Sequence, residues 1–193
     1  MKERNGAFDL ALIAVFAALT AVCSLIPGIQ LPVGVPITLQ TLAVLLAGLV
    51  LGPWRGFLAV LLYLAVGFAG LPVFADATGG LVVFEMPSIG YLLSFPFAAL
   101  AAGALAKLFV KLAWKGQAGW LIGSAIVTSL IVVDIPGIIG MMVVLRVDFW
   151  AAFGYNLPFV PGDLAKCVIA GLIAVVVHKA FPVLLAAKAP VTA

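Results

Sequence analysis

The chain has 193 residues, of which 66% are hydrophobic and only 9% are charged. A soluble domain carries about 25% charged residues, because its surface must face water. The composition therefore excludes an ordinary water-soluble domain and predicts an integral membrane protein whose surface contacts lipid. The formal net charge is +3, and the basic residues form no cluster, so we expect no binding to nucleic acid.

Six apolar segments follow one another along the chain and are long enough, or nearly so, to cross a bilayer. About 20 residues at a rise of about 1.5 Å span the roughly 30 Å hydrocarbon core. We therefore predict an all-α bundle of six transmembrane helices, forming a single domain over residues 1–193. The predicted segments are residues 8–26, 37–51, 54–69, 89–109, 120–145 and 163–185. The second and third are short, and a tight turn separates them.

The first segment has two interpretations. Lys2 and Arg4 precede an apolar run, as in a signal peptide. Equally apolar runs follow throughout the chain, however, so we interpret the segment as a retained first helix. Its small residues recur at four-residue spacing and include Ala14 and Ala18, which would allow another helix to approach closely in lipid. Similar spacing occurs at Gly48 and elsewhere, so the pattern fits internal packing as well as a partner.

The positions of lysine and arginine predict the orientation in the membrane, since cytoplasmic loops are enriched in these residues. With the N-terminus inside, all the bases fall on the inner side except Arg146 and Lys166. Both termini are therefore predicted to be cytoplasmic. The three outer connections, residues 27–36, 70–88 and 146–162, are rich in proline and aromatic residues. Because proline stiffens a chain, they could form a lid over a cavity; an aromatic belt at the membrane interface explains them equally well.

Charged side chains at membrane depth are costly, so each one is a candidate functional group. Asp163 and Lys166 are three residues apart and would leave the same face of the last helix. Pro161 and Gly162 mark a helix start, so one interpretation makes Asp163 a capping residue. The other makes the two charges a polar pair in the wall of an outward-facing pocket.

Asp134 lies in the middle of the fifth segment, shortly before Pro136 and Gly137. It could face the same pocket, couple to a proton, or be satisfied by a neighbouring helix, and the sequence does not choose among these. His178 is the single histidine, and its place near the cytoplasmic end predicts a side chain that snorkels to the interface. Without a histidine pair or a P-loop, we expect no catalytic metal, no cofactor and no ATPase activity in this chain.

Several runs of residues, taken in order, resemble the BioY family, the biotin-specific substrate-binding (S) components of energy-coupling factor (ECF) transporters. Residues 35–48 read VPITLQTLAVLLAG, and residues 158–166 read PFVPGDLAK. Shorter matching runs are residues 51–56, 63–67, 70–74 and 90–92. Together they extend the resemblance over nearly the whole chain. One departure is residues 85–89, which read EMPSI where many relatives are richer in glycine.

The resemblance implies a six-helix, multi-pass S component in the bacterial plasma membrane that captures biotin from outside. Its partners would be a transmembrane (T) component, contacted through Ala14 and Ala18, and cytoplasmic ATPases that hydrolyse the ATP. The pocket would be roofed by residues 28–36 and walled by the fourth to sixth helices. The family's acid–base pair falls on Asp163 and Lys166. The other predicted substrate-binding residues are Thr38, Gln40, Asp76, Tyr91 and Phe159.

Two alternative functions remain open from the sequence. The chain could be an S component for another vitamin or for a metal. It could also be a membrane enzyme that processes a lipid or prenyl substrate, with Asp134, Asp148 and Asp163 as acid–base groups. The chain contains neither an aspartate-rich nor a histidine motif. We therefore expect a transport protein that is surrounded by membrane lipid and is not an enzyme.

Overall fold

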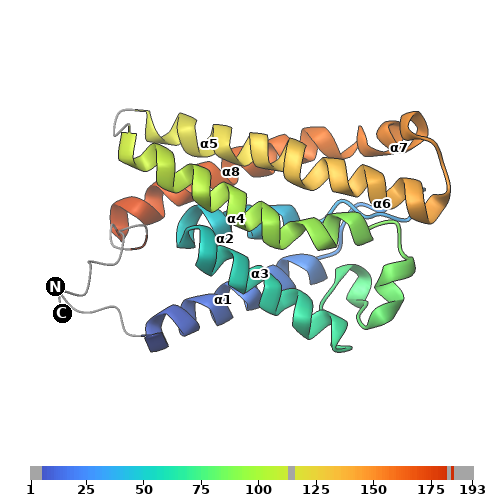
Figure 1. The fold of residues 1–193 in the computed structure, drawn as a ribbon, viewed down its shortest axis with the longest axis horizontal. Helices are drawn as coiled ribbons and strands as arrows, with labels where there is room; N and C mark the ends of the chain where they lie inside the picture. The colour runs from blue at the N-terminus through green and yellow to red at the C-terminus, as the bar shows by residue number, and fades with distance from the viewer. Residues whose placement is uncertain (1–5, 113–115, 182–183, 185–193) are drawn as a thin grey trace.

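The computed structural model describes residues 6–112, 116–181 and 184. Over these residues the chain forms an elongated bundle of helices (Figure 1), with two isolated β-bridges and no strand. The predicted all-α fold is thus confirmed for the described part of the chain. In chain order the α-helices are α1 (Gly6–Leu25), α2 (Gln40–Leu51), α3 (Pro53–Phe68), α4 (Ile89–Leu112), α5 (Gln117–Thr128), α6 (Ile135–Leu145), α7 (Phe149–Asn156) and α8 (Phe159–Ala180).

Four helical spans of the described chain are long and apolar enough to cross a membrane. They are α1, α4, the continuous span Gln117–Leu145 and α8. The span Gln117–Leu145 joins α5 to α6 through a π-helical stretch, η3 (Ser129–Asp134). The apolar helices α2 and α3 are shorter, with 12 and 16 residues.

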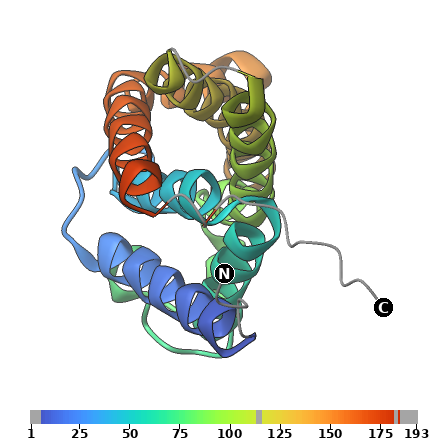
Figure 2. The same cartoon turned by 90° about the vertical axis from the view of Figure 1, so that its left-hand side faces the viewer.

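Helix α2 lies in the interior of the bundle, packed against α1, α3, α4 and α8 (Figure 2). All its residues are buried except Leu42. A helix enclosed by protein needs no lipid-facing side, which explains why it is apolar all round. Gly48 makes the closest approach, because a Cβ at this position would lie 2.3 Å from the carbonyl oxygen of Ala99 on α4.

The end of α2 explains why the His178 side chain is buried. Pro53 follows the helix and has no N–H, so the carbonyl oxygen of Leu49 lacks its helical donor. The Nε2 of His178 lies 2.8 Å from this oxygen, and the His178 side chain is buried. The prediction that His178 snorkels to the interface is therefore wrong: it satisfies an unpaired carbonyl and joins α8 to α2.

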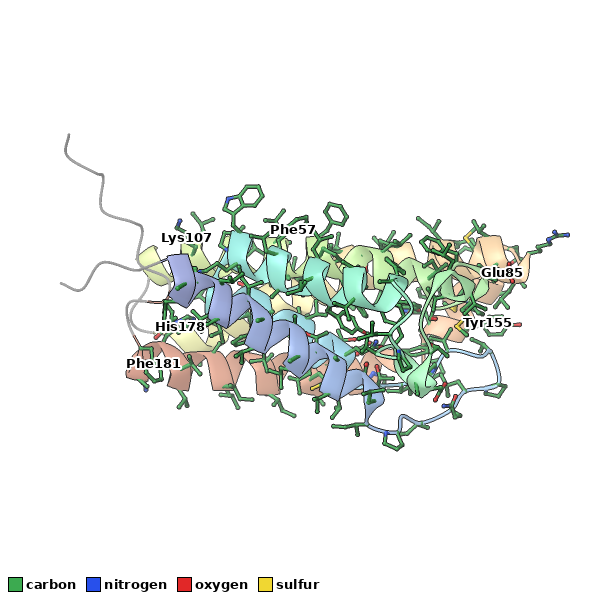
Figure 3. All side chains as sticks on the ribbon, turned by 90° about the horizontal axis from the view of Figure 1, so that it is seen from below. Phe57, Glu85, Lys107, Tyr155, His178 and Phe181 are labelled. Atoms are coloured by element: carbon green, nitrogen blue, oxygen red, sulfur yellow. The ribbon has the colours of Figure 1, made fainter. Side chains whose placement is uncertain are left out.

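The bundle has two distinct ends. Helix α1 begins and α8 ends at one end, whereas α7 and the long connections lie at the other (Figure 1). Figure 3 shows Lys107 and His178 near the first end, and Glu85 and Tyr155 near the second. At the first end Arg55 forms an ion pair with Asp9 at 3.4 Å, which joins α3 to α1.

Two helix boundaries differ from the predictions. The last helix begins at Phe159 rather than at residue 163, because Pro161 falls in the first turn, where a missing N–H removes no helical bond. The connection at residues 146–162 contains the unpredicted helix α7. Asp148 caps α7 by accepting a hydrogen bond from the backbone N–H of Ala151 at 2.8 Å.

The α2–α4 contact can be tested by adding one methyl group. We expect Gly48→Ala to destabilise the purified protein by about 1–3 kcal/mol, because the two helix backbones would have to separate. The measurement is the apparent melting temperature in detergent. Gly123→Ala on α5 is the matched control: a Cβ there meets nothing within 4 Å, so stability should stay the same or rise slightly. Equal losses in the two variants would contradict this packing.

Candidate functional site

A cavity of about 110 Å³ lies where α2, α4 and α8 meet the first two long connections. By the same measure one water molecule needs about 10–15 Å³, so the space accepts a compact ligand or several waters. Its wall combines apolar and polar side chains, as ligand-binding pockets do. The apolar lining includes Val35, Phe74, Val83, Leu92, Phe95 and Phe159, and the polar lining includes Thr38, Gln40, Asp76, Tyr91, Asp163 and Lys166.

Asp163 and Lys166 form a buried ion pair in the wall of this cavity. The Nζ of Lys166 lies 2.8 Å from Oδ1 of Asp163, and their side chains are 9% and 8% exposed. Asp163 lies inside α8, and the cap position is Pro158, which makes no side-chain capping bond. The capping interpretation of Asp163 is therefore wrong. The second carboxylate oxygen and the remaining ammonium protons can accept from and donate to a ligand.

A hydrogen-bonded chain orients the amide of Gln40 at the start of α2. Thr38 Oγ1 donates to Gln40 Oε1 at 2.9 Å, and Gln40 Nε2 donates to the hydroxyl oxygen of Tyr63 on α3 at 2.7 Å. Tyr63 is almost fully buried. The amide keeps one N–H and one oxygen lone pair for a ligand. Its orientation is therefore fixed before any ligand arrives.

Tyr91 on α4 is fixed in a similar way. Its hydroxyl donates to Oδ1 of Asn156 at 2.6 Å, and its ring lies beside the Phe159 ring with centroids 5.9 Å apart. The ring also packs on Gly137, where a Cβ would lie 2.2 Å from ring carbons. Gly137 therefore provides the space for the ring, and the two aromatic residues form a rigid apolar wall.

The first two connections close the cavity together. Gln30 Nε2 donates to Oδ1 of Asp76 at 2.8 Å, which links one connection to the other. The backbone of Ile29 pairs with that of Ile37 at 3.0 and 2.9 Å, and Phe74 is buried beneath them. These two connections favour the lid interpretation. Aromatic side chains on α7 are exposed, as an interfacial belt would be: Phe149, Trp150 and Phe153.

The structure brings all the predicted substrate-binding residues to this one cavity. The walls differ from the prediction, since α2 and the second connection supply lining residues and the lining has none from the fifth predicted segment. Sequence reasoning missed Tyr63 and Asn156 as supports, although both lie in or beside the runs that carry the family resemblance.

Ala14 and Ala18 are exposed on α1. Asp148 is exposed and caps α7, whereas Asp163 is buried, so the three aspartates form no common acid–base site.

Comparisons with known proteins agree with this geometry. The BioY family model matches residues 1–183. The chain is 40% identical to the biotin transporter BioY of Rhodobacter capsulatus, with 96% of this chain and 99% of the relative covered. It is 37% identical to the biotin transporter BioY of Rhizobium etli, with 91% and 96% covered.

A crystal structure of the S-component for biotin from an ECF-type ABC transporter has the same fold. The TM-score is 0.86 at 28% sequence identity, and the match covers 93% of this chain and 95% of the other. The family match and the similarity to relatives both extend over nearly the full length of the chain. The chain therefore belongs to the BioY family.

Proposed function

We propose that this chain captures biotin at the outer side of the bacterial plasma membrane as the S component of an ECF transporter. The observation that carries the proposal is the buried Asp163–Lys166 pair in the wall of a partly apolar cavity. The similarity to proteins named biotin transporters supports the choice of ligand. This function is transport, so the chain performs no catalysis and needs no cofactor of its own.

The chemistry of biotin suits the cavity. Its ureido ring offers two N–H donors and one oxygen acceptor, and its valerate chain ends in a carboxylate. Asp163 accepts from the ureido N–H groups, and Lys166 donates to an oxygen of the ligand. Gln40 and Thr38 add polar contacts, while Tyr91 and Phe159 pack against the thioether ring and the aliphatic chain. A ligand without the ureido group would leave the remaining hydrogen-bonding capacity of the buried pair unsatisfied, which gives selectivity.

The same proposal includes the topology and the partners. The six apolar helical spans each cross or enter the membrane, with both termini in the cytoplasm and the cavity facing outward. The exposed face of α1, including Ala14 and Ala18, contacts the T component, because small residues allow close helix packing in lipid. Cytoplasmic ATPases bound to the T component hydrolyse ATP and drive release of biotin inside.

The central test is biotin affinity in variants of the ion pair. We expect Asp163→Asn and Lys166→Ala each to raise the Kd for biotin at least about tenfold, or about 1.4 kcal/mol, in calorimetric titration of the purified protein. Asp148→Asn is the matched control, since Asp148 caps α7 away from the cavity lining and asparagine also caps. Unchanged affinity in both pair variants, or wild-type binding of another vitamin instead of biotin, would contradict the proposal.

Stability must be separated from binding in this test. A single replacement leaves a buried charge without its partner, at a cost of about 3–5 kcal/mol. The double variant Asp163→Asn/Lys166→Met removes both charges and should recover most of the melting temperature without recovering biotin binding. Recovery of both would show that the pair has only a structural role.

The bond between the two connections provides a second test. Gln30→Ala removes a hydrogen bond that contributes about 0.5–1.5 kcal/mol, so biotin should dissociate about two- to tenfold faster in stopped-flow measurements. Asp76→Ala should have the same effect, and the double variant should be no faster than either one. Glu85→Gln, exposed on the same connection, is the control. A much larger effect of Asp76→Ala than of Gln30→Ala would mean that Asp76 contacts biotin directly.

The partner surface can be tested by adding bulk to α1. We expect Ala14→Trp and Ala18→Trp to reduce co-purification of the T component about tenfold, because the helices can no longer approach closely. Biotin binding by the isolated chain should not change. Val15→Trp on the same helix is the control: Val15 is 60% exposed but lies outside the small-residue stripe. Equal recovery of the T component in all three variants would contradict this contact.

A further inference from the structure

A second group of buried polar atoms lies outside the cavity lining. Within residues 128–134, the hydroxyls of Thr128 and Ser129 and both carboxylate oxygens of Asp134 are buried without a hydrogen-bond partner. The three residues are 1%, 2% and 4% exposed. Asn156 is a neighbour of the carboxylate, but the two side chains do not meet hydrogen-bond geometry. Buried polar groups are normally satisfied by protein, water or an ion, so these oxygens have bonding capacity for a bound ion.

The helical span Gln117–Leu145 is irregular between α5 and α6. Ser129–Asp134 is a π-helical stretch, in which each turn holds an extra residue, so Ser129 and Asp134 lie about one turn apart. Pro136 follows and has no N–H, so a carbonyl of the preceding turn loses its helical donor. Irregular helices at membrane depth supply such carbonyls to bound ions in transporters. The stretch therefore offers a carboxylate and a hydroxyl oxygen about one turn apart.

The surrounding charges leave Asp134 without a counter-ion. The helices α4, α7 and α8 bring Tyr91, Asn156, Asp163, Lys166 and Cys167 near the stretch. Lys166 is the single cation among them, and it is already paired with Asp163 at 2.8 Å. A carboxylate buried in a membrane protein stays ionised only beside a compensating positive charge.

We propose that Asp134 and Ser129 bind a small monovalent cation of the sodium class. All the donors are oxygens, which suits a hard cation. One carboxylate matches one positive charge, and no group of three or more histidine, cysteine or acidic residues that could hold a multivalent metal is present in the described ranges. The side chains of this site do not line the biotin cavity, but Tyr91 and the Asp163–Lys166 pair lie between the two.

The cation also acts on the captured ligand, an inference that rests on the proposed function. Biotin carries a carboxylate, so it adds a negative charge to a cavity beside which Asp134 and Asp163 face one ammonium group. A bound cation cancels the charge of Asp134 and removes that repulsion. Coupling between two sites is reciprocal, so the cation should raise biotin affinity by the same factor by which biotin raises cation affinity.

The cation site is tested first without biotin. We expect NaCl to raise the melting temperature of the ligand-free protein by about 2–4 °C over choline chloride at equal ionic strength. Asp134→Asn should abolish this difference and Ser129→Ala should reduce it, while Asp148→Asn should keep it. If Asp134→Asn does not fold, Ser129→Ala decides the result. Equal melting temperatures in sodium, potassium and choline salts, or a dependence on pH alone, would overturn the site.

The coupling is tested by titrating biotin into the same protein. Sodium should tighten binding about fivefold relative to choline, and Asp134→Asn should remove the difference. A sodium effect on melting without biotin binding would overturn the proposed function but keep the cation site. Biotin binding that does not change with sodium in the wild-type protein would overturn the coupling.

Discussion

The structure of the second end of the bundle depends on one ion pair. The carboxylate of Asp163 and the ammonium group of Lys166 lie 2.8 Å apart on one face of α8. In lipid neither charge can be left alone, and neither can be hydrated without opening the fold. Their mutual bond satisfies only part of their hydrogen-bonding capacity, and the rest faces the cavity. These free bonding positions are available to a polar ligand, and hydrogen bonds to charged groups are stronger than those between neutral groups.

The groups around the pair are fixed from behind by residues that do not line the cavity. Tyr63 holds the amide of Gln40, and Asn156 holds the hydroxyl of Tyr91. These supports come from α3 and α7, so five helices contribute to the site when α2, α4 and α8 are included. A site oriented in this way loses little conformational freedom on binding, which favours high affinity for a small molecule.

Departures from regular helix geometry occur both at the first end of the bundle and in the middle of the span Gln117–Leu145. Pro53 ends α2 early, and His178 compensates for the missing donor. The π-helical stretch before Pro136 turns Asp134 into the protein interior. Such irregularities are tolerated at membrane depth only where protein, rather than lipid, surrounds the freed backbone groups. Both lie against other helices, as this requirement demands.

The sequence by itself predicted a surface that faces lipid, the all-helical class, the family and the residues of the candidate site. These follow from the composition, the length of the apolar segments and the order of the motifs, which are properties of the linear chain. It did not reveal α7, the start of α8 at Phe159, or the role of His178. Those depend on which side chains and carbonyls from distant segments meet. Only the tertiary structure decided that Asp163 is paired rather than capping, and that α2 and the second connection wall the cavity. The three-residue spacing of Asp163 and Lys166 predicts that both lie on one face of a helix. The packing of other helices against that face decides whether it lines a cavity.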